Sequence, residues 1–461
     1  MTDTVMTTAA EPDGAPRMAS LDILRGIAIL GILFMNINHM GGSMFASFGD
    51  IRHLGWSEQD QAAWWVREVF WVGTARCMLE MLFGVGMVIL TERAAKAMEG
   101  SEKVRRGFSA ALHAVFGEGA IMRGYYVRNI VLFLFGLVHI FILLWPGDIL
   151  HTYGLAALVA FLFRRLSWRW LLGVGLTLAT LQLCLGSFFI HQARSGFEVY
   201  QRQQAGATLT AEEKKQVEWV TKRIADNKKN KAEDAARIAA EDKERTSGAY
   251  GWAHSAWTTI LFLEAQFLEL AWIWEAAGTM LVGAALYKLG VIQGRRSWRF
   301  YLITAVIALG FGITSRALTA NHDMIFVTPK PPVYGYAMGE YARLAMTLGY
   351  ICLVQLIVGS GLRLILKPFE AAGRVALSIY IAQTITCIWV LYPPFALALY
   401  GKQGWFELMV TAAAVNASLL VLANLYVLAF RIGPVEWAWR SILAGRALPI
   451  LKARKAAARA G

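Results

Sequence analysis

The sequence LDILRGIAILGILFMNINHM, residues 21–40, begins like a membrane-spanning helix but carries polar groups near both ends. A run of about 20 mostly apolar residues is long enough to cross the hydrocarbon core of a bilayer. Polar side chains in such a helix are costly in lipid and usually face the interior of a helix bundle. In this helix they are Asp22, Arg25, Asn36, Asn38 and His39. We therefore expect the segment to span a membrane and to contribute to a functional site.

The composition of the whole chain is that of an integral membrane protein. Of the 461 residues, 57% are hydrophobic and only 17% are charged. A soluble domain usually has about 25% charged residues with which to cover its surface. The formal net charge of +13 would suit a nucleic-acid-binding protein, but in a membrane protein the positive residues usually mark cytoplasmic connections. We therefore expect membrane lipids as partners and no nucleic acid.

Apolar runs of spanning length recur along the chain and predict an all-α polytopic membrane protein with about ten transmembrane helices. The runs begin near residues 21, 73, 127, 150, 168, 269, 298, 338, 371 and 406, and the fourth is short. Lys and Arg are concentrated in alternate connections between the runs. By the positive-inside rule these connections are cytoplasmic, which predicts that both termini are cytoplasmic.

The runs divide the chain into five predicted parts. A disordered cytoplasmic N-terminus, two transmembrane bundles of about five helices each and a basic cytoplasmic tail are expected at residues 1–20, 21–190, 255–445 and 446–461. Between the bundles, residues 191–254 are dense in both charge signs, and neither Pro nor Gly occurs from Thr208 to Thr246. This pattern predicts an extracytoplasmic insertion containing a long solvated helix. A lid or partner arm and a simple solvated insertion are both compatible with it.

Five ordered motifs resemble the YeiB-like family of bacterial membrane proteins, which carry the domain of unknown function four hundred and eighteen. The motifs are LDILRGIAILGILFMNI, LEMLFGVGMVIL, PGDILHTYG, GRVALSIYIAQT and GPVEWAWR, at residues 21–37, 79–90, 146–154, 373–384 and 433–440. The family is similar in turn to the transmembrane acyltransferases, which include heparan-alpha-glucosaminide N-acetyltransferase. The resemblance implies a bacterial inner-membrane protein that moves an acyl group, most simply acetyl, from cytoplasmic acyl-CoA. The acceptor it implies is a hydroxyl or amine on an extracytoplasmic saccharide or a lipid-linked molecule.

The same resemblance implies which residues carry the reaction. In the O-acyltransferase branch, an Arg in the first helix is followed eleven positions later by a catalytic His, whereas here Arg25 is followed at that spacing by Asn36. The heparan acetyltransferase branch also has Asn there and takes its His from the next outer loop, in a His-x-x-Trp arrangement that His53 and Trp56 reproduce. A neutral His can deprotonate the acceptor or accept the acyl group itself. We expect His53 to do so, with His39 as second choice, although an ordinary loop histidine is the simpler alternative for His53.

Further polar residues are candidates for binding the two substrates. Asp22 and Arg25 are three residues apart, so they can pair on one face of the helix. A planar, multi-donor guanidinium also suits a phosphate group of acyl-CoA, which makes Asp22, Arg25 and Arg374 the candidate donor-binding residues. A structural salt bridge and a lipid headgroup contact are the respective alternatives. Residues expected to line the path to the acceptor are Asn38, Glu80, His151 and Gln383.

Two of these candidates also have structural interpretations. Arg76 and Glu80 are four residues apart and can form an intrahelical pair; otherwise Glu80 would orient a His or relay a proton. Asp148 precedes His151 by three residues in a Pro-Gly turn, where Asp is often a simple cap but can also hold a His tautomer. His139, within the third run, is interpreted as a hydrogen-bonded packing residue.

A transporter or export factor for a small metabolite or lipid is the alternative function, because buried polar groups within many helices are typical of transporters too. A scaffold that binds partners through its charged insertion is a third hypothesis. The sequence has no P-loop, dinucleotide fingerprint, zinc-spaced His and Cys, or serine-hydrolase elbow. No metal is therefore expected, acyl-CoA is the expected co-substrate, and a homodimer is compatible with the pattern.

Overall fold

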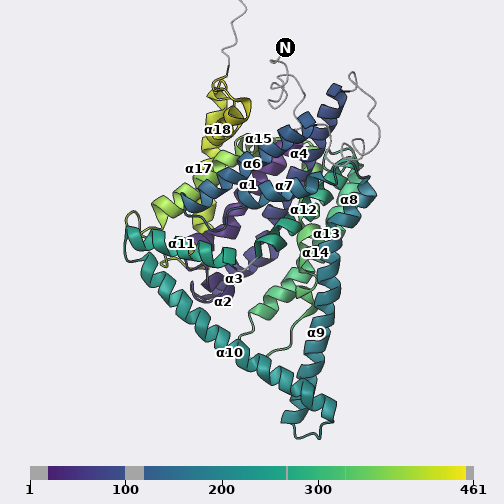
Figure 1. The fold of residues 1–461 in the computed structure, drawn as a ribbon, viewed down its shortest axis with the longest axis vertical. Helices are drawn as coiled ribbons and strands as arrows, with labels where there is room; N and C mark the ends of the chain where they lie inside the picture. The colour runs from purple at the N-terminus through teal and green to yellow at the C-terminus, as the bar shows by residue number, and fades with distance from the viewer. Residues whose placement is uncertain (1–18, 99–118, 266–267, 328, 453–461) are drawn as a thin grey trace, which may run out of the picture.

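The computed structural model describes residues 19–98, 119–265, 268–327 and 329–452 as a bundle of helices with one long arm (Figure 1). Within these residues, the non-helical pairing is an isolated β-bridge between Phe430 and Leu451. The predicted all-α membrane architecture is thereby confirmed. The predicted disordered N-terminus lies outside the described residues apart from its last two positions, and so does most of the basic tail.

Eight helical segments of the described chain are long and apolar enough to cross a membrane. They contain α1 (Ala19–Gly41), α4 (Thr74–Met98), α6 (Gly119–Phe141), α8 (Trp168–Gly175) continuing into α9 (Thr177–Gln204), α12 (Leu268–Lys288), α13 (Trp298–Asp323), α14 (Gly339–Val358) and α17 (Trp405–Ala429). A ninth crossing is possible where α15 (Arg363–Arg374) meets α16 (Ala376–Thr384) and its π-helical continuation η4 (Ile385–Leu391) at an angle of 75°. The remaining run, the fourth in the predicted order, is α7 (Leu150–Phe161), whose 12 residues span only about 18 Å and are too short to cross alone.

The bend between α15 and α16 is built from close backbone contacts and a cap supplied by another helix. A Cβ atom at Gly373 would lie 1.8 Å from the carbonyl oxygen of Asp22, so α15 packs directly on α1. Beyond the bend, Glu436 of α18 (Pro434–Ala444) accepts the N–H groups of Leu377 and Ser378 at 2.7 and 3.2 Å. These are donors that the first turn of a helix cannot satisfy internally. The GRVALSIYIAQT and GPVEWAWR motifs are therefore two halves of one junction.

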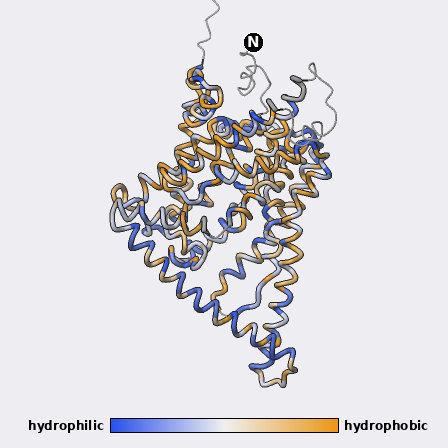
Figure 2. The backbone as a smooth tube through the Cα atoms, viewed as in Figure 1, coloured by the Kyte–Doolittle hydropathy of each residue, from blue (hydrophilic) through white to orange (hydrophobic). Residues whose placement is uncertain are grey.

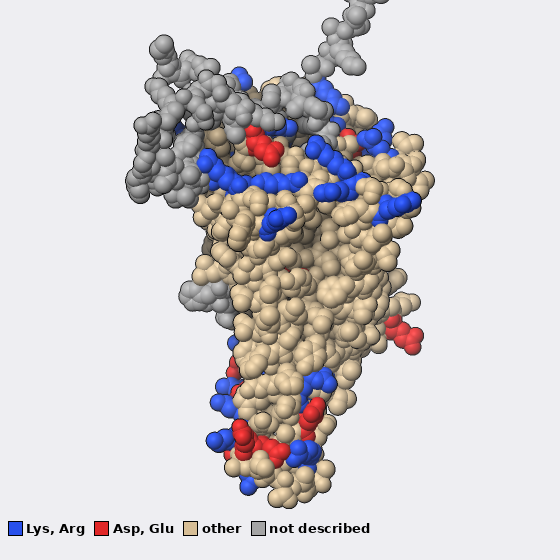
Figure 3. Space-filling model, turned by 90° about the vertical axis from the view of Figure 1, so that its right-hand side faces the viewer, with Lys and Arg blue, Asp and Glu red and all other residues tan. Residues whose placement is uncertain are grey.

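The bundle has two distinguishable ends. The start of α1 packs on the end of α15, and α18 caps α16 just beyond it, so these elements share one end of the bundle, which we call the termini end (Figure 1). Figure 3 shows Lys and Arg side chains grouped toward that end, then a broad belt without charge, and charges of both signs at the opposite tip. Connections near the starts of α8 and α13 carry the exposed residues Arg165, Arg169, Arg295, Arg296 and Arg299. This arrangement agrees with a membrane-spanning belt, and the cytoplasmic location of the termini end stays a prediction.

The charged insertion forms an arm at the other end, which we call the arm end. Helix α9 runs out of the bundle, α10 (Ala211–Arg245) returns diagonally beneath it, and α11 (Ala249–Ala265) leads back to α12 (Figure 1). Most of the chain along α10 is hydrophilic, in contrast to the bundle (Figure 2). Thr210 and Glu213 form a capping box that starts α10. The predicted long helix is confirmed, and its 35 residues extend about 52 Å.

Candidate functional site

His53 lies at the arm end, in a turn after the short helix α2 (Ala46–Gly49), and contacts the arm directly. Its Nε2 atom lies 2.7 Å from Oδ2 of Asp242 in the last turns of α10. The hydroxyl of Tyr400, in the connection between η4 and α17, donates to the other oxygen of Asp242 at 2.9 Å. The side chains of His53 and Asp242 are 33% and 31% exposed, respectively. An aspartate-held histidine therefore stands at a surface that a substrate can reach.

A buried ion pair determines where Asp242 lies. Glu241 and Arg245 pair at 2.9 Å, with both side chains only 2% exposed. Glu241 also accepts the hydroxyl of Ser43 at 2.6 Å, just after α1, and the guanidinium of Arg245 lies 5.6 Å from the ring centroid of Tyr400. Since a buried charge is costly unless paired and hydrogen-bonded, these contacts hold the end of α10 against the loop that carries His53.

The remainder of the His-x-x-Trp loop is held by aromatic packing. Trp56 makes edge-to-face contacts with Trp64 and Phe326, with ring centroids 5.7 and 5.5 Å apart. Trp64 belongs to α3 (Glu58–Val66), which continues through the π-helix η2 (Arg67–Trp71) toward α4. The loop between α1 and α4 therefore contains a helix of its own. The indole of Trp405 donates to the carbonyl of Ile51 at 2.7 Å and joins the loop to α17.

The chemistry open to His53 follows from this geometry. With Asp242 ionised, Nε2 of His53 carries the proton that the carboxylate accepts, and Nδ1 is the basic nitrogen. A carboxylate in this position fixes the tautomer and stabilises the imidazolium that forms when the ring takes a second proton. His53 and Asp242 therefore have the geometry of a general-base pair.

The polar residues at the end of α1 separate into different roles. Asn38 is buried, donates to Ser47 at 2.9 Å and accepts from Arg67 at 3.0 Å, so its amide ties the loop to α1. Asn36 and His39 are half-buried. The end of α1 also packs on the loop, because a Cβ atom at Gly42 would lie 2.3 Å from Leu54. The structure thus brings the end of α1 next to the residue that follows His53.

The predicted donor-binding residues lie at the termini end. Arg25 pairs with Asp22 at 2.9 Å, as the spacing predicts, and the side chain of Arg25 is 41% exposed. The same Nη1 atom lies 3.5 Å from the carbonyl oxygen of Gly373 at the end of α15, immediately before Arg374. The three candidates Asp22, Arg25 and Arg374 therefore gather around the junction of α1 and α15.

Glu80 belongs to a buried ion network rather than to a single pair. The predicted contact with Arg76 is present at 3.5 Å, but the shorter partner is Arg343 of α14 at 2.8 Å. Arg343 also contacts Glu275 of α12 at 3.0 Å and Glu340 at 2.6 Å, and Arg76 pairs with Glu275. Sequence reasoning missed Arg343, which lies 263 positions from Glu80 with no local spacing to link them.

His151 belongs to a second buried centre, arranged around Asp148. One carboxylate oxygen of Asp148 lies 2.6 Å from Nδ1 of His139, and the other lies 2.9 Å from both the backbone N and Nδ1 of His151. Asp148 therefore accepts the backbone N–H of His151, as a helix cap does, and also contacts the ring of His151 in a way that can fix its tautomer. Nε2 of His139 contacts the hydroxyl of Thr384 at 2.8 Å, and Nε2 of His151 lies 3.3 Å from Glu269. His139 is fully buried and hydrogen-bonded, in line with the packing role predicted for it.

Gln383 connects three helices. Its amide donates to the side chain of Asn416 on α17 at 2.9 Å and to the carbonyl of Ile29 on α1 at 3.2 Å. Asn416 in turn donates to the carbonyl of Leu30 at 2.8 Å. These bonds give Gln383 a bridging role in helix packing.

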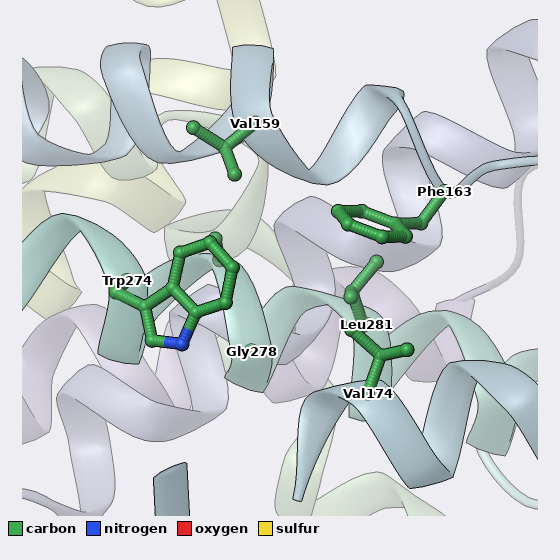
Figure 4. Close-up of a pocket in the computed structure, with 7 residues that line it drawn as sticks. Val159, Phe163, Val174, Trp274, Gly278 and Leu281 are labelled. Atoms are coloured by element: carbon green, nitrogen blue, oxygen red, sulfur yellow. The ribbon is translucent and has the colours of Figure 1, made fainter. Parts of the chain in front are cut away.

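A small hollow between α7, α8 and α12 is lined by aliphatic and aromatic residues (Figure 4). Val159, Phe163 and Trp274 are among the side chains around it, and the close approach of α8 and α12 places the backbones of Gly175 and Gly278 next to each other. None of the predicted site residues lines it. Within the described residues, no group of three or more His, Cys, Asp and Glu is placed to bind a metal ion.

Comparison with known proteins gives a family match for the C-terminal part of the chain. Residues 286–446 match the family model described as a protein of unknown function, DUF418. The chain is 27% identical over 447 residues to the uncharacterized protein YxaH of Bacillus subtilis (strain 168), covering 95% of this chain and 97% of that protein. It is 25% identical over 457 residues to the uncharacterized protein YeiB of Escherichia coli (strain K12), covering 94% and 98%.

No solved structure matches the chain significantly. The relatives are bacterial, and the matches extend over nearly the full length of each. The chain is thus a multi-pass membrane protein whose residues 286–446 match the DUF418 family, a family of unknown function.

Proposed function

We propose that this protein is a bacterial inner-membrane acyltransferase that moves an acyl group from acyl-CoA, bound at the termini end, to a hydroxyl or amine at the arm end. The observation that supports the proposal is the contact between His53 and Asp242, a general-base geometry at an accessible surface. Position in the fold supports it too, because the end of α1 packs on Leu54 beside His53. The resemblance of the opening helix and the His-x-x-Trp loop to transmembrane acyltransferases agrees with the same assignment.

The reaction that we assign to His53 is a direct transfer. Nδ1 of His53 removes the proton from the acceptor, whose oxygen or nitrogen attacks the thioester carbonyl. The carbon–sulfur bond then breaks, and the imidazolium returns the proton to the leaving thiolate, so that the products are the acylated acceptor and CoA thiol. Asp242 stabilises the imidazolium between these two steps. The amide of Asn36 is the candidate donor to the developing oxyanion.

The donor would bind at the opposite end of α1. Arg25 is exposed enough to meet a phosphate group and contacts the carbonyl of Gly373, the residue before Arg374. From Arg25 to His39 the helix rises roughly 21 Å, at about 1.5 Å per residue. The acyl-bearing arm of the donor therefore has to pass through the bundle alongside α1 to reach the arm end.

Transport of a small metabolite or lipid is the second candidate. It is favoured by the buried titratable groups around Arg343 and Asp148 and by the 75° break between α15 and α16. Broken helices and intramembrane charges are typical of transporters. The break comes directly after Gly373 and Arg374, and Arg25 contacts the carbonyl of Gly373, so either function would use the same junction.

One experiment separates these functions. Full-length protein purified in detergent is incubated with radiolabelled acetyl-CoA, and thioester cleavage is followed for wild type, His53→Gln and Asp242→Asn. His254→Gln is the matched control, because His254 is also an exposed histidine paired with an arm carboxylate, Glu244. We expect cleavage that the first two variants lose and the control retains. Absence of acyl-CoA binding by calorimetry would overturn the enzyme proposal and leave transport.

A further inference from the structure

A groove of about 430 Å³ opens at the arm end of α17, outside the residues assigned to acyl transfer. Its volume is within the range of roughly 300–1,000 Å³ typical of small-molecule sites. One side is apolar and the other is polar. Its lining residues are Leu399, Phe406 and Val410, and Lys402, Gln403, Glu407 and Thr411.

The polar side presents one cation and one anion. Lys402 is exposed and forms no ion pair within the part of the chain that the structure describes. Glu407 is exposed as well, and one of its oxygens accepts the N–H of Gly404 at 3.2 Å. Lys402 can therefore bind an anionic group of a ligand, and Glu407 can bind a cationic group.

Between these charges the groove has a fixed polar wall. The amide of Gln403 donates to the hydroxyl of Thr411 at 2.9 Å and accepts from that of Tyr392 at 3.3 Å. The backbone on this side is anchored, because Gly401 donates to the carbonyl of Gly41 at 2.8 Å. The groove is thus held by hydrogen bonds to α1 and to its own helix.

The apolar side continues along the surface of α17 toward the termini end. Phe406 and Val410 are 46% and 52% exposed. Successive residues of a helix are about 100° apart around its axis, so five exposed apolar side chains of α17 fall within one sector about 100° wide and form a stripe along the helix. The stripe consists of Phe406, Val410, Val421, Leu425 and Leu428. Because α17 is a candidate span with most of its surface exposed, this stripe faces the surroundings of the bundle at the level of the apolar belt.

We propose that the groove binds a phospholipid with a zwitterionic headgroup, a phosphate followed by an ammonium. The phosphate lies against Lys402, the ammonium against Glu407, and the acyl chains along the stripe that begins at Phe406 and Val410. Lys402 and Glu407 supply two opposite charges that complement such a headgroup, while an anionic headgroup would leave Glu407 opposed by a like charge. The assignment goes beyond the acyl transfer proposed above and does not rest on it.

The groove shares a loop with the candidate base pair. Tyr400, which donates to Asp242 at 2.9 Å, lies within this connection between Leu399 and Lys402. The N–H of Phe406 donates to Asp60 at 3.0 Å, which joins the start of α17 to the first turn of α3. A lipid in the groove therefore holds its headgroup beside the same loop that orients Asp242.

The test measures lipid binding without any acyl donor, so its outcome is independent of the enzyme assay. Full-length, delipidated protein in detergent is titrated with dioleoyl phosphatidylethanolamine or dioleoyl phosphatidylglycerol, and bound lipid is counted by native mass spectrometry. We expect phosphatidylethanolamine to bind about tenfold more tightly, and Lys402→Gln and Glu407→Gln each to lose about that factor, the size of one charge-assisted contact. Glu407→Lys should reverse the preference toward phosphatidylglycerol.

Lys228→Gln on α10 and Glu58→Gln on α3 are matched controls, since both side chains are exposed and neither lines the groove. They should bind as wild type does. Gel-filtration profile and melting temperature check that each variant is folded. Equal binding of the two lipids by wild type, or an unchanged preference in Glu407→Lys, would overturn the assignment.

Discussion

Nε2 of His53 lies 2.7 Å from Oδ2 of Asp242, although the two residues are 189 positions apart in the chain. The contact joins the loop that follows α1 to the last turns of the arm helix α10. The arm is therefore part of the candidate site, and changes in it should be measurable in the reaction assigned to His53.

The first prediction concerns Asp242. Replacing it by Ala removes the group that orients the ring of His53 and stabilises the imidazolium, so acyl transfer should fall by up to about 10²–10⁴-fold, the size of general acid–base catalysis. Tyr400→Phe keeps the carboxylate of Asp242 and removes one of its hydrogen bonds. The rate of acyl transfer in this variant should fall by about tenfold. The measurement is the initial rate of acetyl-CoA consumption. Wild-type rates in Asp242→Ala would contradict a role for the pair.

The second prediction concerns the buried pair of Glu241 and Arg245. Arg245→Met leaves the carboxylate of Glu241 buried without its partner, which should cost about 3–5 kcal/mol and release the end of α10. The expected observations are a lower melting temperature in detergent and faster proteolysis within residues 211–245. The double variant Glu241→Gln with Arg245→Met should recover part of the loss. A double variant as unstable as Arg245→Met would show that the unpaired charge is not the cause.

The third prediction compares two helical glycines. A Cβ atom at Gly26 would lie 2.0 Å from the carbonyl oxygen of Phe369, whereas one at Gly86 would meet no atom within 4 Å. Gly26→Ala should therefore separate α1 from α15 and lower the melting temperature. Gly86→Ala should be neutral or stabilising by up to about 1 kcal/mol, because Ala is the better helix former. Equal melting temperatures for the two variants would argue against direct packing of α1 on α15.

The fourth prediction concerns pH and Glu436, which caps α16 from α18. Burial raises the pKa of Glu436 above its usual value of 4.5, and the hydrogen bonds from Ser378 and Leu377 offset this only in part. A carboxyl whose pKa is raised by folding contributes stability that is fully present below about pH 4.5 and is lost as the pH rises through the folded value.

Ionisation of Glu436 should therefore lower the melting temperature of wild type as the pH rises from about 4.5 toward neutral. In Glu436→Gln the amide oxygen still accepts N–H groups but does not ionise, so this contribution should disappear. The readout is the difference between the two melting curves across that pH range. Parallel curves would contradict the raised pKa.

Much of the architecture was accessible from local patterns. Apolar length predicted the spans, since the bilayer imposes it on any crossing helix, and the charged stretch around residues 211–245 predicted α10 because it lacks Pro and Gly. The i to i+3 spacing of Asp22 and Arg25 predicted their pair. Each of these features depends on neighbours within one helix, where side-chain geometry follows from residue number alone.

The candidate site depends on contacts between distant segments. Nothing in the sequence near His53 points to Asp242, and nothing near Glu80 points to Arg343. Asp148 was recognisable as a neighbour of His151, but not of His139 and Thr384 as well. By itself, then, the sequence determined a multi-span helical membrane protein with a solvated helical arm, because hydrophobic length and periodicity are local properties. The tertiary structure alone decided which charges meet, because helix packing brings together side chains whose separation along the chain carries no geometric information.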